Sequence, residues 1–217
     1  MKHERILVLS GDTPRSPILT ALLAVIVAAL ALAPFLFPGA KSLNVAATLC
    51  IFAILAASYD LLLGYTGIVS FAHTMFFGIG SYGLAIALYS LGPSWGAIFV
   101  GLACGLPCAA LLALAIGLFS LRVQALFFAM ITLAVASAFA VLASQLSEIT
   151  GGEDGRSFKV PGLLQPGFTL VPRDVFGIAV TGKTLTYYLV FFVCVILFLL
   201  LLRVVNSPFG RVLQAIR

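Results

Sequence analysis

Long apolar runs, interrupted by only a few polar segments, are the feature that most constrains what this chain can fold into. About 20 apolar residues in a helix cross the ~30 Å hydrocarbon core of a bilayer, and several runs approach or exceed that length. The whole chain is 62% hydrophobic and 9% charged, whereas soluble domains carry about 25% charged residues. The sequence therefore predicts an all-α, polytopic integral membrane protein and argues against a soluble enzyme.

Six runs are each predicted to form one membrane-spanning helix, and together they define a transmembrane domain over residues 18–205. The second and third runs are separated only by Gly64-Tyr65-Thr66-Gly67. A single helix over 43–90 would be roughly 70 Å long, more than twice the thickness of the core, so we expect a break or a hairpin at Gly64–Gly67. The predicted spans are Ile18–Phe37, Leu43–Leu63, Ile68–Ser90, Trp95–Leu118, Val123–Leu146 and Leu185–Leu202.

The first run has an alternative interpretation as a cleavable signal peptide, because Ala31-Leu32-Ala33 resembles a cleavage site. The run is longer than the apolar region of a usual signal peptide, and a polar leader precedes it. We therefore expect an uncleaved first span.

Lys and Arg residues near the span ends predict the orientation. With the N-terminal segment 1–17 in the cytoplasm, most of the flanking basic residues also fall on the cytoplasmic side. The polar segment 147–183 then forms an outer loop, and residues 206–217 return to the cytoplasm. The net charge of +5 arises from these scattered flanks rather than from a basic patch, which argues against nucleic-acid binding.

All four cysteines lie inside apolar runs, where cysteine behaves as a small hydrophobic residue. No histidine or second cysteine pair completes a metal-binding set, so we predict neither a disulfide framework nor a metal site. The cysteines are Cys50, Cys104, Cys108 and Cys194.

Two matches to nucleotide-binding motifs lack the strand–turn–helix setting that such motifs need. Gly177-Ile-Ala-Val-Thr-Gly182-Lys183-Thr184 has the letters of a phosphate-binding loop but runs into a predicted span. Gly78-Ile-Gly80-Ser-Tyr-Gly83 lies inside an apolar helix. Small residues at such spacings let helices pack closely in lipid. We assign that role to Gly78, Gly80 and Gly83 and to two further repeats. The repeats are Gly101-x-x-x-Gly105 and Ala113-x-x-x-Gly117.

A few polar groups inside the predicted spans are candidates for function. Asp60 either faces a water-filled path or is hydrated near the cytoplasmic interface, and His73 either lines a path or packs between helices. The break at Gly64–Gly67 either turns a helix N-terminus toward a ligand, as in many transporters, or is an ordinary hairpin turn. No nucleophile–base–acid grouping is visible, so no enzyme activity is predicted.

Three stretches resemble the LivM-type permeases, which are membrane subunits of bacterial ABC importers for branched-chain amino acids. The first and most specific runs from Tyr59 to Tyr82. The second, Leu146 to Gly155, contains Thr-Gly-Gly-x-Asp-Gly, and the third runs from Ser207 to Arg217. The three stretches follow one another in the order that the family shows.

The resemblance implies a permease domain in the bacterial inner membrane that moves branched-chain or similar amino acids. It implies a second, related permease subunit, two cytoplasmic ATP-binding subunits and a periplasmic substrate-binding protein as partners. ATP would be bound by those partners, and no cofactor is expected on this chain. The candidate path residues are Asp60, Tyr65, Thr66 and His73, with Gly64 and Gly67 at the helix break. The expected ATPase-coupling residues are Pro208, Phe209, Gly210, Arg211, Ala215, Ile216 and Arg217.

This sequence differs from the family in two ways that affect these expectations. The family usually has Asn where Asp60 stands, which bears on the role of this residue and on the substrate. Family members also continue beyond Ala215-Ile216-Arg217, so we expect an incomplete permease whose coupling segment only begins at 206–217. The alternatives are a sister permease for urea, amides or other small polar solutes, and a non-transporting fragment.

Overall fold

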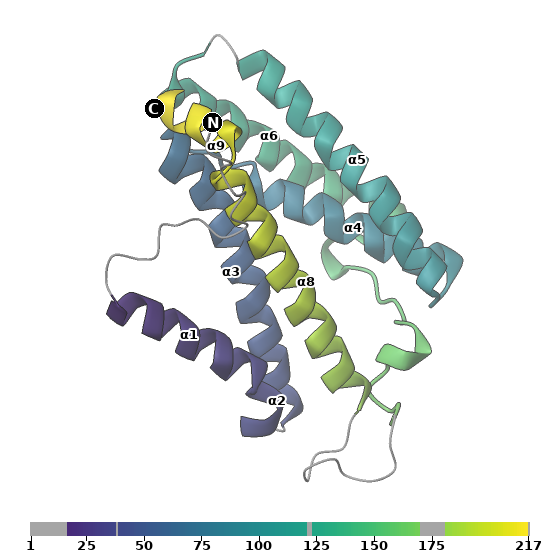
Figure 1. Ribbon diagram of the computed structural model, residues 1–217. Helices are drawn as coiled ribbons and strands as arrows, with labels where there is room; N and C mark the ends of the chain where they lie inside the picture. The colour runs from purple at the N-terminus through teal and green to yellow at the C-terminus, as the bar shows by residue number, and fades with distance from the viewer. Residues whose placement is uncertain (1–16, 38, 121–122, 170–180, 217) are drawn as a thin grey trace, which may run out of the picture. The chain divides into compact units, whose positions relative to one another are not determined.

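The computed structural model describes residues 17–37, 39–120, 123–169 and 181–216, and these residues are mostly helical (Figure 1). Five helices in the described chain are long and apolar enough to cross a membrane. They correspond to the second to sixth predicted spans, so the chain is an all-α polytopic membrane protein. These helices are α3 (Ala40–Thr66), α4 (His73–Leu91), α5 (Trp95–Ser120), α6 (Ala125–Gln145) and α8 (Gly182–Val205).

The first predicted span, Ile18–Phe37, is not one helix. The structure divides it into α1 (Pro17–Ala31) and α2 (Ala33–Leu36). Proline has no backbone N–H, so Pro34 cannot donate to the Leu30 carbonyl one turn earlier. The Phe35 N–H bonds to the Leu32 carbonyl (2.9 Å). Two carbonyls in the last turn of α1, those of Leu30 and Ala31, therefore need other partners.

Two tyrosines on α8 supply these partners. The Tyr187 hydroxyl donates to the Leu30 carbonyl (2.5 Å) and the Tyr188 hydroxyl to the Ala31 carbonyl (3.3 Å). Tyr187 is 2% exposed and packs in a small core with Ala33. Because an unpaired carbonyl is costly in hydrocarbon, these hydroxyls explain why the chain can turn at Pro34.

The chain forms two compact units, and each is described by itself. The first unit contains residues 1–66 and 166–217. In it α3 and α8 lie side by side, α1 and α2 pack near one end of this pair, and α9 (Pro208–Ile216) contacts both helices near the other end (Figure 1).

The second unit, Gly67–Gln165, is built on the close pair α4 and α5, with α6 beside α4. Three short helices follow α6 in the segment that was predicted as a polar loop. They are α7 (Ser147–Thr150), η1 (Gly152–Asp154) and η2 (Gly162–Leu164).

Glycines allow the backbones of α4 and α5 to approach each other. A Cβ at Gly101 would lie 2.8 Å from the Leu84 Cα, and one at Gly83 would lie 3.0 Å from the Gly105 Cα. These distances confirm close helix packing as the role of Gly83 and Gly101, whereas a Cβ at Gly105 would come no closer than 3.6 Å to its neighbours. A Cβ at Gly117, by contrast, would have no described atom within 4 Å, so the predicted packing role of that glycine is not seen in the described chain.

Replacing Gly101 by Val should separate α4 from α5, because the new side chain would overlap the Leu84 backbone. Overpacking of this kind costs about 1–3 kcal/mol, measured as the free energy of unfolding in mixed detergent micelles. Gly117→Val is the matched control, since it adds the same side chain to a helix position with open space around it. Equal destabilisation by both changes would contradict the packing role.

Replacing Tyr187 by Phe removes the hydroxyl that bonds the Leu30 carbonyl and leaves the ring in place. The expected loss is about 1 kcal/mol in the free energy of unfolding, measured in the same micelles. Tyr188→Phe is the internal comparison and should cost less, because its hydrogen bond is longer. An unchanged unfolding free energy for Tyr187→Phe would show that the α1 carbonyls need no partner from α8.

Candidate functional site

The helix break lies slightly later in the chain than predicted. α3 continues through Gly64 and ends at Thr66, whose hydroxyl donates to the Leu62 carbonyl (2.5 Å). The break begins at Gly67, which has a φ of 72°, a backbone conformation that non-glycine residues rarely adopt. A glycine inside a helix costs only about 1 kcal/mol, so Gly64 does not end α3.

The start of α4 is held by the middle of α6. The Phe71 N–H donates to the Thr132 hydroxyl oxygen (3.1 Å), and that hydroxyl donates to the Ala129 carbonyl (2.9 Å). Thr132 is 1% exposed and follows Ala125, the first residue of α6, by seven positions. At 1.5 Å per residue this is about 10 Å along the helix. The beginning of α4 therefore lies beside the interior of α6 rather than beside its end.

The predicted path residues fall on both sides of this break. Asp60, Tyr65 and Thr66 lie on the last two turns of α3 in the first unit, and His73 is the first residue of α4 in the second unit. Asp60 is exposed, Thr66 is buried, and Tyr65 and His73 are half-buried. A Cβ at Gly64 would lie 2.8 Å from Asp60 Oδ1, so the glycine provides room for the carboxylate. That these residues line a path stays a prediction.

A groove of about 320 Å³ lies between α4 and α6. Three residues with hydroxyl groups line it, Thr74, Tyr82 and Ser144, and Gly152 lines it as well. Thr74 is in the first turn of α4 and Gly152 follows the far end of α6, so the groove leads from η1 to the start of α4. We call it the polar groove. Its other lining residues are Met75, Ala136, Phe139, Ala140 and Ala143.

The polar groove was not identified from the sequence. The signal that could have revealed it is the spacing of Ala136, Ala140 and Ser144, which places three small residues on one face of a helix. A stripe of this kind more often indicates helix packing, so the spacing alone does not distinguish a groove from a contact.

The segment after α6 folds back onto the helix end through Thr150. Its hydroxyl lies 2.6 Å from the Ala143 carbonyl and 2.8 Å from the Leu146 carbonyl, and it accepts the Gly152 N–H at 3.1 Å. Gly151 has a φ of 87°, and a Cβ there would lie 2.5 Å from the carbonyl carbon of the glycine four residues later. This geometry explains why the Thr-Gly-Gly-x-Asp-Gly stretch needs its threonine and its first glycine.

Arg156 connects the same segment to α4. Its Nη2 donates to the Glu148 carbonyl (2.5 Å), and its guanidinium carbon lies 4.0 Å from the centroid of the Tyr89 ring. A guanidinium over an aromatic face is a favourable cation–π contact. The segment is therefore attached to the ends of both α4 and α6.

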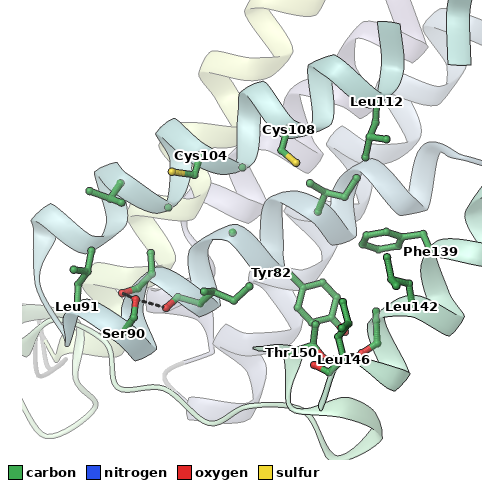
Figure 2. Close-up of a pocket in the computed structure, with 18 residues that line it drawn as sticks. Tyr82, Ser90, Leu91, Cys104, Cys108, Leu112, Phe139, Leu142, Leu146 and Thr150 are labelled. Atoms are coloured by element: carbon green, nitrogen blue, oxygen red, sulfur yellow. Dashed lines mark hydrogen bonds between the residues drawn. The ribbon is translucent and has the colours of Figure 1, made fainter. Parts of the chain in front are cut away.

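A second, apolar cavity of about 580 Å³ lies between α4, α5, α6 and α7 (Figure 2). Tyr82, Phe139 and Ala143 line this cavity and the polar groove alike. The rings of Tyr82 and Phe139 meet edge to face with centroids 6.4 Å apart. This aromatic pair therefore lies where the two cavities adjoin.

The lining of the apolar cavity is not suited to an amino acid. None of the lining residues is charged. The Ser90 hydroxyl donates to the Ile86 carbonyl (2.8 Å), and the Thr150 hydroxyl lies within hydrogen-bonding distance of the Ala143 and Leu146 carbonyls. A buried carboxylate or ammonium group needs strong polar partners, which this lining does not provide.

The C-terminal segment forms an amphipathic helix, α9. The Ser207 hydroxyl accepts the Gly210 N–H (3.3 Å), and Pro208 occupies the first position of α9, so the start of the helix has a typical cap. A Cβ at Gly210 would lie 2.0 Å from the Val205 carbonyl oxygen, which explains the glycine at this turn. Phe209 and Val212 are 60% and 54% exposed. The Ile216 side chain and Arg217 lie outside the described residues.

The remaining sequence predictions concern Lys183 and the cysteines. Gly182, Lys183 and Thr184 form the first turn of α8, whereas the preceding residues 170–180 lie outside the described chain. All four cysteines are free thiols, and no group of His, Cys, Asp or Glu among the described residues is arranged to hold a metal. Cys104 and Cys108 are exposed and line the apolar cavity instead of packing inside a helix bundle.

Comparison with known proteins places this architecture in a family. The family described as "Branched-chain amino acid transport system / permease component" matches residues 41–217, a stretch that contains the helix break, both cavities and α9. No curated protein and no solved structure matches the chain. The family is one of transport permeases, not of enzymes, and its members work with the other components of ABC transporters. The chain therefore belongs to the permease components of branched-chain amino acid transport systems.

Proposed function

We propose that this chain is the membrane permease subunit of an ABC importer that moves branched-chain or similar amphipathic amino acids into a bacterial cell. The observation that carries the proposal is the family match over residues 41–217. The energy would come from ATP hydrolysed by two cytoplasmic partner subunits. A second, related permease subunit would complete the pathway, and a periplasmic binding protein would deliver the substrate.

The start of α4 is the part of the proposed path that best suits an amino-acid carboxylate. The first N–H groups of a helix carry partial positive charge and bind anions, and Ala72, which precedes α4, has no side chain that could cap them. The polar groove supplies hydroxyl-bearing residues between this site and η1. Asp60, Tyr65 and Thr66 precede the break in the sequence and His73 follows it, and each is a candidate path residue of its own unit.

The proposed orientation places the N-terminus and α9 in the cytoplasm and segment 147–183 on the outer face of the inner membrane. The binding protein would then meet the segment that Thr150 and Arg156 attach to α4 and α6. In the cytoplasm α9 would dock on an ATPase subunit through its exposed apolar side chains, Phe209 and Val212. Pro208, Gly210 and Arg211 on α9, together with Ala215, Ile216 and Arg217, belong to the same proposed coupling surface.

The full chain, reconstituted in proteoliposomes with its partner subunits and binding protein, should take up radiolabelled leucine only when ATP is enclosed. Unlabelled isoleucine and valine should compete with leucine because they share an aliphatic side chain and the same charged groups, whereas urea should not. Uptake of labelled urea without uptake of leucine would instead support a permease for small polar solutes. Absence of uptake for both, with the complex assembled, would support a non-transporting fragment.

Replacing Thr132 by Val removes the oxygen that accepts the Phe71 N–H and should free the start of α4. A lost hydrogen bond at a buried backbone group costs about 1–3 kcal/mol, so we expect leucine uptake to fall about tenfold or more at equal amounts of protein in the membrane. Thr132→Ser retains the hydroxyl and is the matched control. If both variants transport leucine at the same rate, the bond does not position the path.

A further inference from the structure

The lining of the apolar cavity favours hydrocarbon over water. Its walls come from the spans α4, α5 and α6 and from α7, and they carry no charged side chain. The Ser90 and Thr150 hydroxyls already bond to backbone carbonyls, so water would find few partners. Apolar cavities stay dry, and an empty one forfeits the dispersion contacts of its walls.

The cavity is open to its surroundings. Several lining residues are well exposed, among them Leu91 (57%), Val100 (45%) and Leu142 (53%). A long, flexible molecule could therefore enter from the side without any opening of the helix pairs.

The length of the cavity matches one lipid chain. Its lining on α5 extends from Val100 to Leu112, which is about 18 Å along the helix. Half of the hydrocarbon core, the depth reached by the acyl chains of one leaflet, is about 15 Å. The length of the cavity thus fits one acyl chain.

A positive charge lies over Tyr89, next in the chain to two residues that line the cavity. The Arg156 guanidinium covers the Tyr89 ring, and Tyr89 is followed in the chain by Ser90 and Leu91, which line the cavity. A guanidinium has five N–H donors, so its bond to the Glu148 carbonyl leaves it able to bind a phosphate. Tyrosine at this position also suits the membrane interface.

We propose that this cavity binds one acyl chain of a phospholipid from the leaflet that adjoins segment 147–165, with the lipid phosphate held by Arg156. The bound chain completes the packing of α4, α5 and α6 on the side of the Tyr82–Phe139 pair that faces away from the polar groove. The site does not depend on the proposed transport activity, because it needs only the second unit and a membrane.

The test uses the purified full chain in nanodiscs that contain a phosphatidylglycerol with a photoreactive group on one acyl chain. After illumination, peptides that cover residues 100–112 and 139–146 should carry more label than the lipid-facing part of α8. Cys108→Trp fills the cavity and should abolish this excess, whereas Cys194→Trp on α8 should not. Cys104→Leu is a smaller filling change for the case in which the tryptophan prevents folding.

Arg156→Gln tests the phosphate site. Loss of a charge-assisted contact should weaken the preference for phosphatidylglycerol over a photoreactive diacylglycerol about tenfold, and Lys159→Gln on the same segment is the matched control. Equal labelling of α5 and α8, or labelling that survives both filling variants, would overturn the proposal. Loss of the label when the second permease subunit is co-purified would show that a partner helix covers the cavity instead.

Discussion

Backbone hydrogen bonding in hydrocarbon is the constraint on which the rest of this structure depends. An unpaired N–H or C=O costs several kcal/mol there, so each interruption of a helix needs a partner from another element. At Pro34 the partners are the hydroxyls of Tyr187 and Tyr188 on α8. At the α3–α4 break the Phe71 N–H is paired with Thr132 in the middle of α6. Both interruptions are thus tied to a distant helix by side-chain hydroxyls.

The Thr132 hydroxyl also determines where α4 begins, and with it the place of the polar N-terminus of that helix. Because Thr132 holds the chain beside the interior of α6, α4 begins beside a point about 10 Å along α6 from its first residue. A helix N-terminus inside a bilayer attracts negative charge more strongly than one in water. The same interaction that satisfies the backbone therefore creates the feature that best suits a substrate carboxylate in the proposed permease function.

In the second unit, a few shared residues lie between the polar groove and the apolar cavity. Tyr82 and Phe139 contribute to both cavities, with hydroxyl-bearing residues along the groove and a mostly aliphatic and aromatic lining without charged side chains in the larger cavity. Glycines make this arrangement compact, since Gly83 and Gly101 bring α4 and α5 together. The polar groove and the apolar cavity of this unit arise from packing between its helices and not from the sequence pattern of any single helix.

Some elements of this fold were predicted from the sequence, and others were not. The spans α3 to α6 and α8 and the close packing at Gly83 and Gly101 were predicted, because run length and small-residue spacing are local properties. The turn at Pro34 was missed, although a proline within a span was visible, since its acceptability depends on tyrosines 153 and 154 positions later. The break was predicted to begin three residues too early, because Gly64 remains helical and the break begins at Gly67.

The amino-acid sequence alone was enough to show that the chain is a membrane protein, to predict five of the apolar helices long enough to cross a bilayer, and to point to the family. The chain has few charged residues, and its apolar runs are as long as the bilayer core is thick. Lipid is therefore the solvent in which it can be stable. The folded structure was needed to show where α4 begins, which residues line the polar groove, and that two thiols line an apolar cavity. Those features depend on contacts between helices far apart in sequence, and no local pattern encodes which faces meet.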